Sequence, residues 1–565
     1  MSSNSIDLPA EGAFLKGKSS DRLVVILHAY NQTPQRMGQL AGAVRTWLPD
    51  SDILVPALPF SIFSFADPEQ VANEVIARID TLTTENYGEI LLIGHSIGAV
   101  LARKVWVAAH GMTSGNGSNA QPRPWAAKIV RIVQLAALNR GWMISSALNP
   151  RDRVYWTLGK LWGNFCCHAL GRDPLIFGFQ RGAPFLTLTR LQCLQLQQSL
   201  GSNAPMVVQL IGSVDDMVAP TDNVDLATGA AFAYIEVNDV THEGIVDVTP
   251  ASREALHQAI CGRPGDIAAL ALNPTDVYDL HAEDDDYDLH RPPRPNRKVK
   301  HVVFVIHGIR DRGFWTRRIA RVMRTQARLD GDFCKTVTST YGFFAMGPFL
   351  LPWVRREKVH WLLDQYVTVK SLYPDALISY IGHSNGTYLL AKAMTLCPAI
   401  NIERAIFAGS VVRSDFEWHH FMGGRIKAVV NYVATRDWVV AIFPNGLQAM
   451  GQDLGGAGHN GFEDKQAVNV RYIDGSHGAA LASEHWREMS DFIFTGDVPS
   501  QGLVTEQDCS VKRLGAWAPF ICVFLVVAVV LVFLAILMQF SPANLGWLAL
   551  LLVLTTAIKI IVTKL

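Results

Sequence analysis

Two stretches of the chain decide the fold: ILLIGHSIG at residues 90–98 and ISYIGHSNG at residues 378–386. Each begins with an apolar run typical of a buried parallel strand, passes through a G-x-S-x-G turn, and continues into a helix-like segment. Small residues flank the serine because a sharp turn must lift its Oγ clear of the sheet without a clash. One such motif is a weak signal, but here the order of strand, turn and helix occurs twice.

Outward from both stretches, short apolar runs alternate with segments of helical spacing. The predicted strands of the first part cover residues 23–27, 90–93, 129–135, 206–211 and 232–237. Those of the second part cover residues 302–306, 376–381, 405–408, 428–433 and 468–473. Several runs are nearly continuous, as in parallel strands covered on both faces. The fold class predicted is therefore α/β, with two mostly parallel sheets and flanking helices.

The first unit contains further residues of a Ser-His-Asp set, in the chain order Ser, Asp, His. One predicted strand runs into GSVDDMV at residues 212–218, and the next ends shortly before His242. With Ser96 in the turn, this order resembles the α/β-hydrolase superfamily, and within it the lipases and serine esterases. The resemblance covers nearly the whole unit and implies acyl transfer through a covalent intermediate.

The resemblance also implies a role for each matching residue of the first unit. Ser96 is then the nucleophile, His242 the general base, and Asp215 the residue that orients the imidazole, with Asp216 as its close rival. The backbone N–H groups of Tyr30 and Ile97 are expected to hold the oxyanion. Ala29 departs from the pattern, because these families usually have glycine there. An added methyl could tighten or misplace the first oxyanion donor.

The second unit repeats the pattern with the expected glycine at Gly308. By the same resemblance Ser384, Asp437 and His477 form the second set, and Ile309 and Asn385 are the oxyanion donors. His459 competes for the base role, but His477 directly follows a predicted strand, as His242 does.

Two apolar segments are candidates for the substrate-binding walls. A long insertion at about 139–205 interrupts the first unit and predicts a cap. It is rich in aromatic residues, namely Trp142, Trp156, Trp162, Phe165, Phe177, Phe179 and Phe185. These either suit an acyl chain or simply pack the cap. In the second unit, residues 341–353 either border the site, touch a membrane or form a buried connection.

The C-terminal end predicts a membrane anchor, since no charged residue occurs from Leu514 to Ile558. Residues 514–565 read as a transmembrane hairpin of two helices, about 517–538 and 545–562, with a tip at residues 541–544. Basic residues flank the hairpin at both ends, which predicts an integral membrane protein with its catalytic domains on the cytoplasmic side. The alternatives are a buried or an interfacial hairpin.

These observations give five expected segments. They are a first hydrolase domain at 1–265, a linker at 266–299, a second hydrolase domain at 300–498, a short linker at 499–513 and the hairpin at 514–565. Within the first linker, residues 279–298 are acidic and then rich in proline and arginine, so we interpret their histidines and aspartates as solvated rather than metal-binding.

Composition excludes some classes of function. Lysine plus arginine equal aspartate plus glutamate at 50 each, so charge gives no case for nucleic-acid binding. The eight cysteines show no paired motif, which fits a reducing compartment. No secretory signal is seen, and no metal or organic cofactor is implied.

The sequence therefore predicts a membrane-anchored serine hydrolase that cleaves lipid or other acyl esters. Three alternatives stay open: a thioesterase or other acyl hydrolase of soluble substrates, one catalytic unit beside a binding or regulatory copy, and a membrane scaffold with vestigial sites. Oligomeric state is not predicted.

Overall fold

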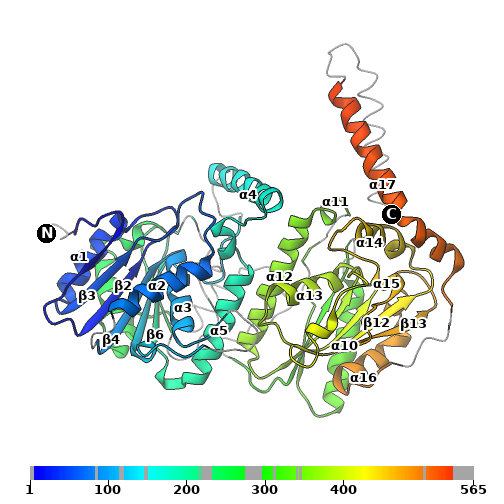
Figure 1. The fold of residues 1–565 in the computed structure, drawn as a ribbon. Coiled ribbons are helices and arrows are strands. Elements are labelled where there is room, and N and C mark those ends of the chain that lie inside the picture. Colours follow the sequence, from blue (N-terminus) through cyan, green and yellow to red (C-terminus); the bar gives the residue numbers. More distant parts are fainter. Residues whose placement is uncertain are drawn as a thin grey trace.

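The computed structural model describes two sheets, each with helices on both faces (Figure 1). It describes residues 5–538 except 83–86, 114–119, 145–149, 216, 218–224, 226–231, 274–294, 310–312, 339–340, 343–345, 500–503 and 505. Asp216, the central part of the predicted linker and the second predicted hairpin helix lie outside the described residues.

The first sheet has seven strands in the order β1-β3-β2-β4-β5-β6-β7, parallel except for β1. The strands are β1 (Gly12–Leu15), β2 (Arg22–Leu27), β3 (Ser51–Pro56), β4 (Glu89–His95), β5 (Ile129–Leu135), β6 (Met206–Gly212) and β7 (Phe232–Val237). Alternate residues of β2 pack on opposite faces, Leu23, Val25 and Leu27 on one and Val24 and Ile26 on the other. Burial on both faces explains the nearly continuous apolar runs.

Helices cover both faces of this sheet. One face carries α2 (Pro68–Leu82), α3 (Ile97–Ala109) and α5 (Pro184–Leu200), and the other carries α1 (Gly38–Trp47), α7 (Arg253–Cys261) and α8 (Pro264–Leu270). The predicted insertion forms α4 (Pro150–Leu170), a short 3-10 turn and α5. Helix α8 occupies the start of the predicted linker.

The second sheet has six parallel strands in the order β13-β12-β11-β10-β8-β9. They are β8 (His301–Ile306), β9 (Cys334–Val337), β10 (Leu377–His383), β11 (Ile402–Ala408), β12 (Ile426–Ala434) and β13 (Ala467–Ile473). Helices α12 (Pro352–Leu372) and α13 (Asn385–Leu396) pack on one face, and α10 (Phe314–Leu329) and α16 (Trp486–Phe494) on the other. Further helices are α11 (Met346–Phe349), α14 (Trp438–Ala449), α15 (Ala457–Asn460) and α17 (Cys509–Met538).

All ten predicted strands are confirmed, while β1, β3 and β9 were not predicted. The domain boundaries themselves stay a prediction.

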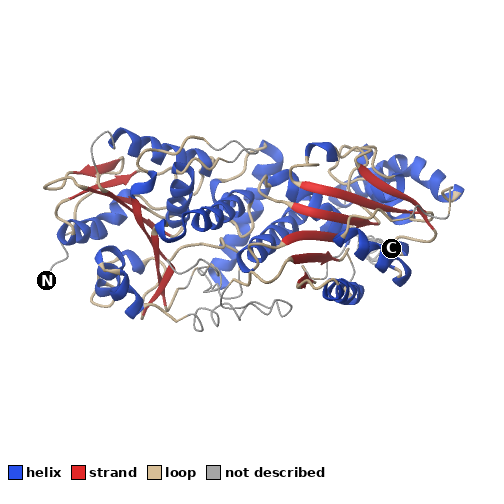
Figure 2. Ribbon diagram, turned by 90° about the horizontal axis from the view of Figure 1, so that it is seen from below, coloured by secondary structure: helices blue, strands red, loops and turns tan. Residues whose placement is uncertain are grey.

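The two sheets are joined through helices that lie between them (Figure 2). Helix α5 of the first unit packs on α12 of the second, and Leu188 of α5 belongs to the second unit's core. At the centre of this contact Asp364 of α12 accepts hydrogen bonds from Arg140 at 2.8 Å and from Arg190 at 2.6 Å. Arg190 also binds Asp225 at 2.8 Å. All four side chains are almost fully buried, so each charge is compensated inside the protein rather than by water.

The predicted transmembrane hairpin is wrong. No helix among the described residues combines the length and the apolar character needed to cross a membrane. The first part of α17, where the spanning helix was expected, instead packs on α14: Ala518 and Cys522 are buried against Gly446, and Asn445 donates to the Gly515 carbonyl at 3.0 Å. The prediction of an integral membrane protein with cytoplasmic catalytic domains, and of the membrane as a partner through residues 514–565, depended on this hairpin and is withdrawn with it. An apolar segment can bury its side chains against protein as well as against lipid.

The buried aspartate at the contact allows a test of how the two units are held together. Replacing Asp364 by alanine leaves Arg140 and Arg190 buried with less compensating charge, so we expect a loss of about 3–5 kcal/mol in unfolding free energy. Asp173→Ala is the control, because its ion pair with Arg356 also joins the units but is partly exposed, and should cost about 0–1 kcal/mol. Urea unfolding of the full chain measures both. Equal losses would contradict a special role for the buried pair.

Candidate active sites

Both G-x-S-x-G motifs form the same strained turn between a strand and a helix. Ser96 lies between β4 and α3 with φ 55° and ψ −118°, and Ser384 lies between β10 and α13 with φ 51° and ψ −119°. This is a backbone region that non-glycine residues rarely adopt. A Cβ on Gly98 would come within 2.6 Å of two backbone carbonyl oxygens, at Leu27 and His28. The glycine is therefore required by the close approach of helix α3 to strand β2.

The first unit brings its three predicted side chains together. His242 Nε2 lies 3.0 Å from Ser96 Oγ, and His242 Nδ1 lies 2.9 Å from Asp215 Oδ2. The other carboxylate oxygen of Asp215 accepts the Met217 N–H at 3.0 Å, which fixes the carboxylate. All three side chains are about 95% buried or more. This chain of hydrogen bonds can transfer the serine proton to the histidine while the aspartate stabilises the resulting imidazolium.

The predicted oxyanion donors of the first unit flank the serine. Tyr30 follows β2, and Ile97 is the first residue of α3, so its N–H has no acceptor within the helix. Both residues line a cavity that also contains Ser96 and His242. Ala29 is buried in the wall of the same cavity, and its methyl group is accommodated beside a complete Ser96–His242 hydrogen bond. The donor roles remain predictions.

The cap covers the first serine with apolar side chains. Trp142, Trp156 and Ile176 form one side of the cavity, and the rings of Trp142 and Trp156 lie 5.4 Å apart. The cavity volume is only about 70 Å³. Not every aromatic residue of the cap faces inward, because Trp162 and Phe165 on α4 are each 58% exposed. Part of the cap thus lines the cavity, while part of α4 faces solvent.

The second unit brings together its predicted acid and base. His477 Nδ1 lies 2.9 Å from Asp437 Oδ2, while Asp437 Oδ1 accepts the Val440 N–H at 3.0 Å and caps α14. His459, the predicted alternative, is buried elsewhere and its Nδ1 contacts Gln507 Nε2 at 2.7 Å. Within the described residues no hydrogen bond joins Ser384 Oγ to His477. The second set is therefore less complete than the first, the reverse of what Ala29 suggested.

The predicted oxyanion residues of the second unit are packed against the segment after β9. Ile309 follows β8, and Asn385 begins α13. The Asn385 side chain donates to Tyr341 Oη at 3.1 Å, and that hydroxyl donates to the His307 carbonyl at 2.9 Å. Tyr341 thus contacts a predicted oxyanion residue and is itself buried, so a stretch that borders the site and a buried connection both stay possible for residues 341–353.

Sequence reasoning missed a histidine that precedes each serine. His95 Nε2 lies 2.9 Å from the carbonyl oxygen of His242, and His383 Nε2 lies 3.3 Å from that of His477. Burial, together with the nearby His242, lowers the pKa of His95 to about 3, so this ring is neutral and can donate to the carbonyl. These residues hold the backbone of the predicted base in both units. The shared G-H-S-x-G spelling was the available signal.

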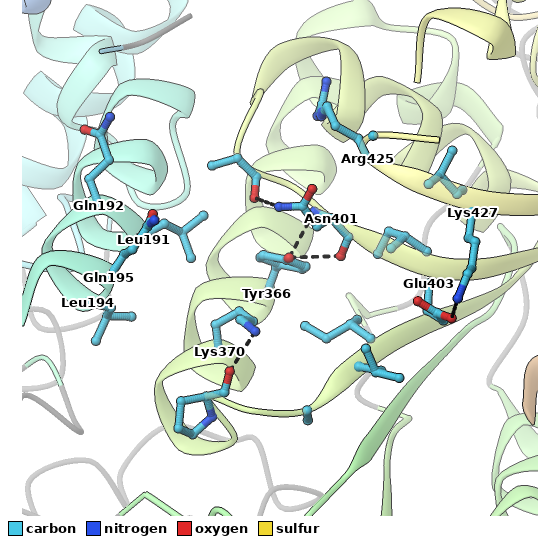
Figure 3. Close-up of a pocket in the computed structure, with 18 of the residues that line it drawn as sticks. Leu191, Gln192, Leu194, Gln195, Tyr366, Lys370, Asn401, Glu403, Arg425 and Lys427 are labelled. Carbon is cyan, nitrogen blue, oxygen red and sulfur yellow. Dashed lines mark hydrogen bonds and ion pairs between the residues drawn. The ribbon is translucent and has the colours of Figure 1, made fainter. Parts of the chain in front are cut away.

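A cavity larger than the one at Ser96 lies away from both serines. It has a volume of about 670 Å³ and is lined by residues of α5, of α12 and of the amino ends of β10, β11 and β12. Figure 3 shows Leu191, Leu194 and Gln195 of α5 on one side and Tyr366 and Lys370 of α12 facing them. No predicted catalytic residue lines it, so cavity size does not identify the candidate active site here.

Together these features define the class of protein. A parallel sheet with a nucleophile elbow after a central strand, and with an acid and a histidine after later strands, is the α/β-hydrolase fold. The chain contains this fold twice.

Solved structures with the same fold match the chain, although no protein-family model and no curated protein does. One is the Paleococcus ferrophilus monoacylglycerol lipase, 14% identical, with a TM-score of 0.30, covering 46% of this chain and 100% of that one. Another is a structure described under the metagenome-derived lipolytic enzymes LipS and LipT, 11% identical, with a TM-score of 0.29 and coverage of 45% of this chain and 98% of that one. A third, the NocB thioesterase domain from the nocardicin cluster, is 18% identical, with a TM-score of 0.26 and coverage of 44% and 98%.

The glycine before Ile309 can be tested directly. A Cβ at Gly308 would lie 2.7 Å from Ser384 Cβ and 3.2 Å from its Oγ. In a Ser96→Ala background, we therefore expect Gly308→Ala to slow reaction of Ser384 with a fluorophosphonate by about 100- to 1,000-fold, as loss of one oxyanion donor does. Ala29→Gly in a Ser384→Ala background is the matched control and should change labelling little. Unchanged labelling of the Gly308→Ala variant would show that the serine tolerates the methyl.

The charge of Asp437 predicts a pH dependence for the second unit. Burial disfavours the imidazolium of His477, but the charge and hydrogen bond of Asp437 outweigh it and raise the pKa of His477 above its ordinary value of 6.5. A general base works in its neutral form, so activity is lost as pH falls through this raised pKa. In Ser96→Ala protein, the acid limb of kcat/KM for an ester should have its midpoint above pH 6.5. A midpoint at or below 6.5 would contradict the pairing.

Proposed function

We propose that this protein is a serine hydrolase that cleaves carboxylic esters of acyl or lipid type through an acyl-enzyme, with Ser96 as its principal nucleophile. The observation that carries the proposal is the unbroken chain Ser96–His242–Asp215 beneath an apolar cap. The lipases, esterases and thioesterases among the structures of the same fold support ester or thioester cleavage.

The mechanism follows from the positions of these groups. His242 Nε2 accepts the Ser96 proton as Oγ attacks the acyl carbonyl, and Asp215 stabilises the imidazolium. The Tyr30 and Ile97 N–H groups receive the oxyanion, each worth about 3 kcal/mol of transition-state stabilisation. The imidazolium then protonates the leaving alcohol, and water hydrolyses the acyl-enzyme through the same base.

The cavity favours an apolar acyl group. Its lining by Leu138, Trp142, Trp156 and Ile176 offers hydrocarbon contact, and few of its walls are polar. At about 70 Å³ it is far smaller than the ~300–1,000 Å³ of typical ligand pockets. A short acyl chain fits this closed form, and a longer chain requires α4 to move away.

A second candidate function is that the second unit binds or regulates rather than catalyses. It is favoured by the Ser384–His477 pair, which lacks the hydrogen bond present in the first unit. Hydrogen bonds of this kind often tighten only when substrate binds, so Ser384 is also a candidate nucleophile.

Fluorophosphonate labelling separates these functions. We compare wild type, Ser96→Ala, Ser384→Ala and the double variant of the full chain. We expect Ser96→Ala to lose most of the rapid labelling and the double variant to lose all labelling. Ser384→Ala should label almost as wild type does. Slow residual labelling of Ser384 would make the second unit a weak hydrolase, and none would favour the regulatory role. If folded wild-type protein does not label at all, the proposed function is wrong.

A further inference from the structure

A cluster of metal-ligating side chains lies in the loop between β11 and β12, outside both candidate active sites. Glu417, His419 and His420 each offer a donor atom, and these atoms lie within 4.8 Å of one another. The two imidazole ring centroids are 4.1 Å apart, and His420 Nε2 lies 3.2 Å from Glu417 Oε2. All three residues are exposed, so an ion can reach them from solvent.

One histidine of the cluster is oriented by a carboxylate from a different loop. His419 Nδ1 lies 2.9 Å from Asp464 Oδ2, in the segment before β13. The same oxygen accepts the His419 backbone N–H at 2.8 Å, while the other accepts the Gln466 N–H at 2.9 Å. With its Nδ1–H donated to Asp464, His419 presents the lone pair of Nε2. Histidine ligands of zinc are held by carboxylates in this way, which fixes their tautomer and raises their basicity.

The backbone that carries the cluster is anchored in the hydrophobic core. Trp418, between Glu417 and His419, is completely buried and packs edge to face or tilted against Phe407, Phe416 and Phe462. The backbone carrying the ligands is therefore anchored, and only their side chains need to move. In a tetrahedral zinc site, neighbouring ligand atoms lie about 3.3 Å apart. Because Asp464 holds His419, it is the exposed side chains of Glu417 and His420 that must rotate to reach that separation.

We propose that Glu417, His419 Nε2 and His420 form a Zn²⁺ site, with water as a further ligand and Asp464 as the residue that positions His419. Two imidazoles and one carboxylate suit zinc, whereas Mg²⁺ and Ca²⁺ prefer oxygen ligands alone. The ion replaces the His420–Glu417 contact. Through Asp464 it links the loop after β11 to the segment before β13, the strand that leads to His477. Its role is to stabilise the second unit, and it takes no part in the ester chemistry.

The test uses the full chain and Zn²⁺ alone. Isothermal titration of wild type should show one site, which His420→Ala weakens at least roughly tenfold. His485→Ala is the matched control, because His485 is also paired with a neighbouring glutamate, Glu484, at 3.5 Å but has no second histidine. It should leave the affinity unchanged. Asp464→Asn should weaken binding by about 10- to 100-fold while His419 and His420 remain present.

Two further measurements show whether lost binding reflects misfolding and whether other histidines bind the ion. Saturating Zn²⁺ should raise the thermal unfolding midpoint of wild type but not that of His420→Ala, since a ligand bound only to the folded state stabilises it. His281→Ala combined with His290→Ala, in the acidic linker, should bind as wild type does. Equal affinities of the His420→Ala and His485→Ala proteins would overturn the proposal, as would loss of binding in the linker variant.

Discussion

The structure depends on a single constraint, which is that a serine with positive φ stands between a buried strand and the helix that returns across the sheet. Ser96 and Ser384 adopt nearly identical backbone angles, and each donates its N–H to the end of the next strand, at Leu135 and Ala408, over 2.9 Å. This backbone conformation costs of order 1–3 kcal/mol, so contacts with the surrounding structure must hold the serine in it. The glycines that flank each serine allow the helix and the strand to approach closely enough to make these contacts.

Around this shared turn the two units differ in how they complete the site. In the first, the histidine bridges serine and aspartate, and a cap closes over them. In the second, the acid and histidine are paired, and Tyr341 contacts Asn385, a predicted oxyanion residue. Each aspartate uses one carboxylate oxygen for a backbone N–H and the other for the histidine. The two units therefore share the way in which the aspartate orients the histidine. They differ in the residues that surround the serine.

Much of this arrangement could be predicted from the sequence, because local patterns encode it. Buried parallel strands appear as continuous apolar runs, and the order Ser, Asp, His places three residues at strand ends of one sheet edge. Features that depend on contacts far apart in the chain could not be predicted. Strand β3 has an apolar run of only three residues, 53–55, because it begins with Ser51 and Asp52. The buried carboxylate of Asp52 accepts hydrogen bonds from Gly17, Ser20 and Tyr87. The hairpin prediction failed for a related reason. Hydropathy shows only that the segment of α17 is apolar. The structure shows that one side of α17 packs on α14, while Trp517, Phe520 and Phe524 are exposed.

The contact between the units bears on both sites, because α12 carries Asp364 at its centre and also contacts Tyr341. Asp364 at its middle is held by Arg140, which lies two residues before Trp142 in the wall of the first cavity. One turn or two earlier on the same helix, Lys358 donates to the Tyr341 carbonyl at 2.9 Å and Trp361 packs on the Tyr341 ring. Tyr341 in turn receives the Asn385 side chain. A helix cannot shift at Asp364 without moving residues one or two turns away, so the buried ion pairs fix the position of Tyr341 as well as the junction. The predicted oxyanion residues of the second unit are therefore held partly through the first unit, by charges that would be costly to bury without partners.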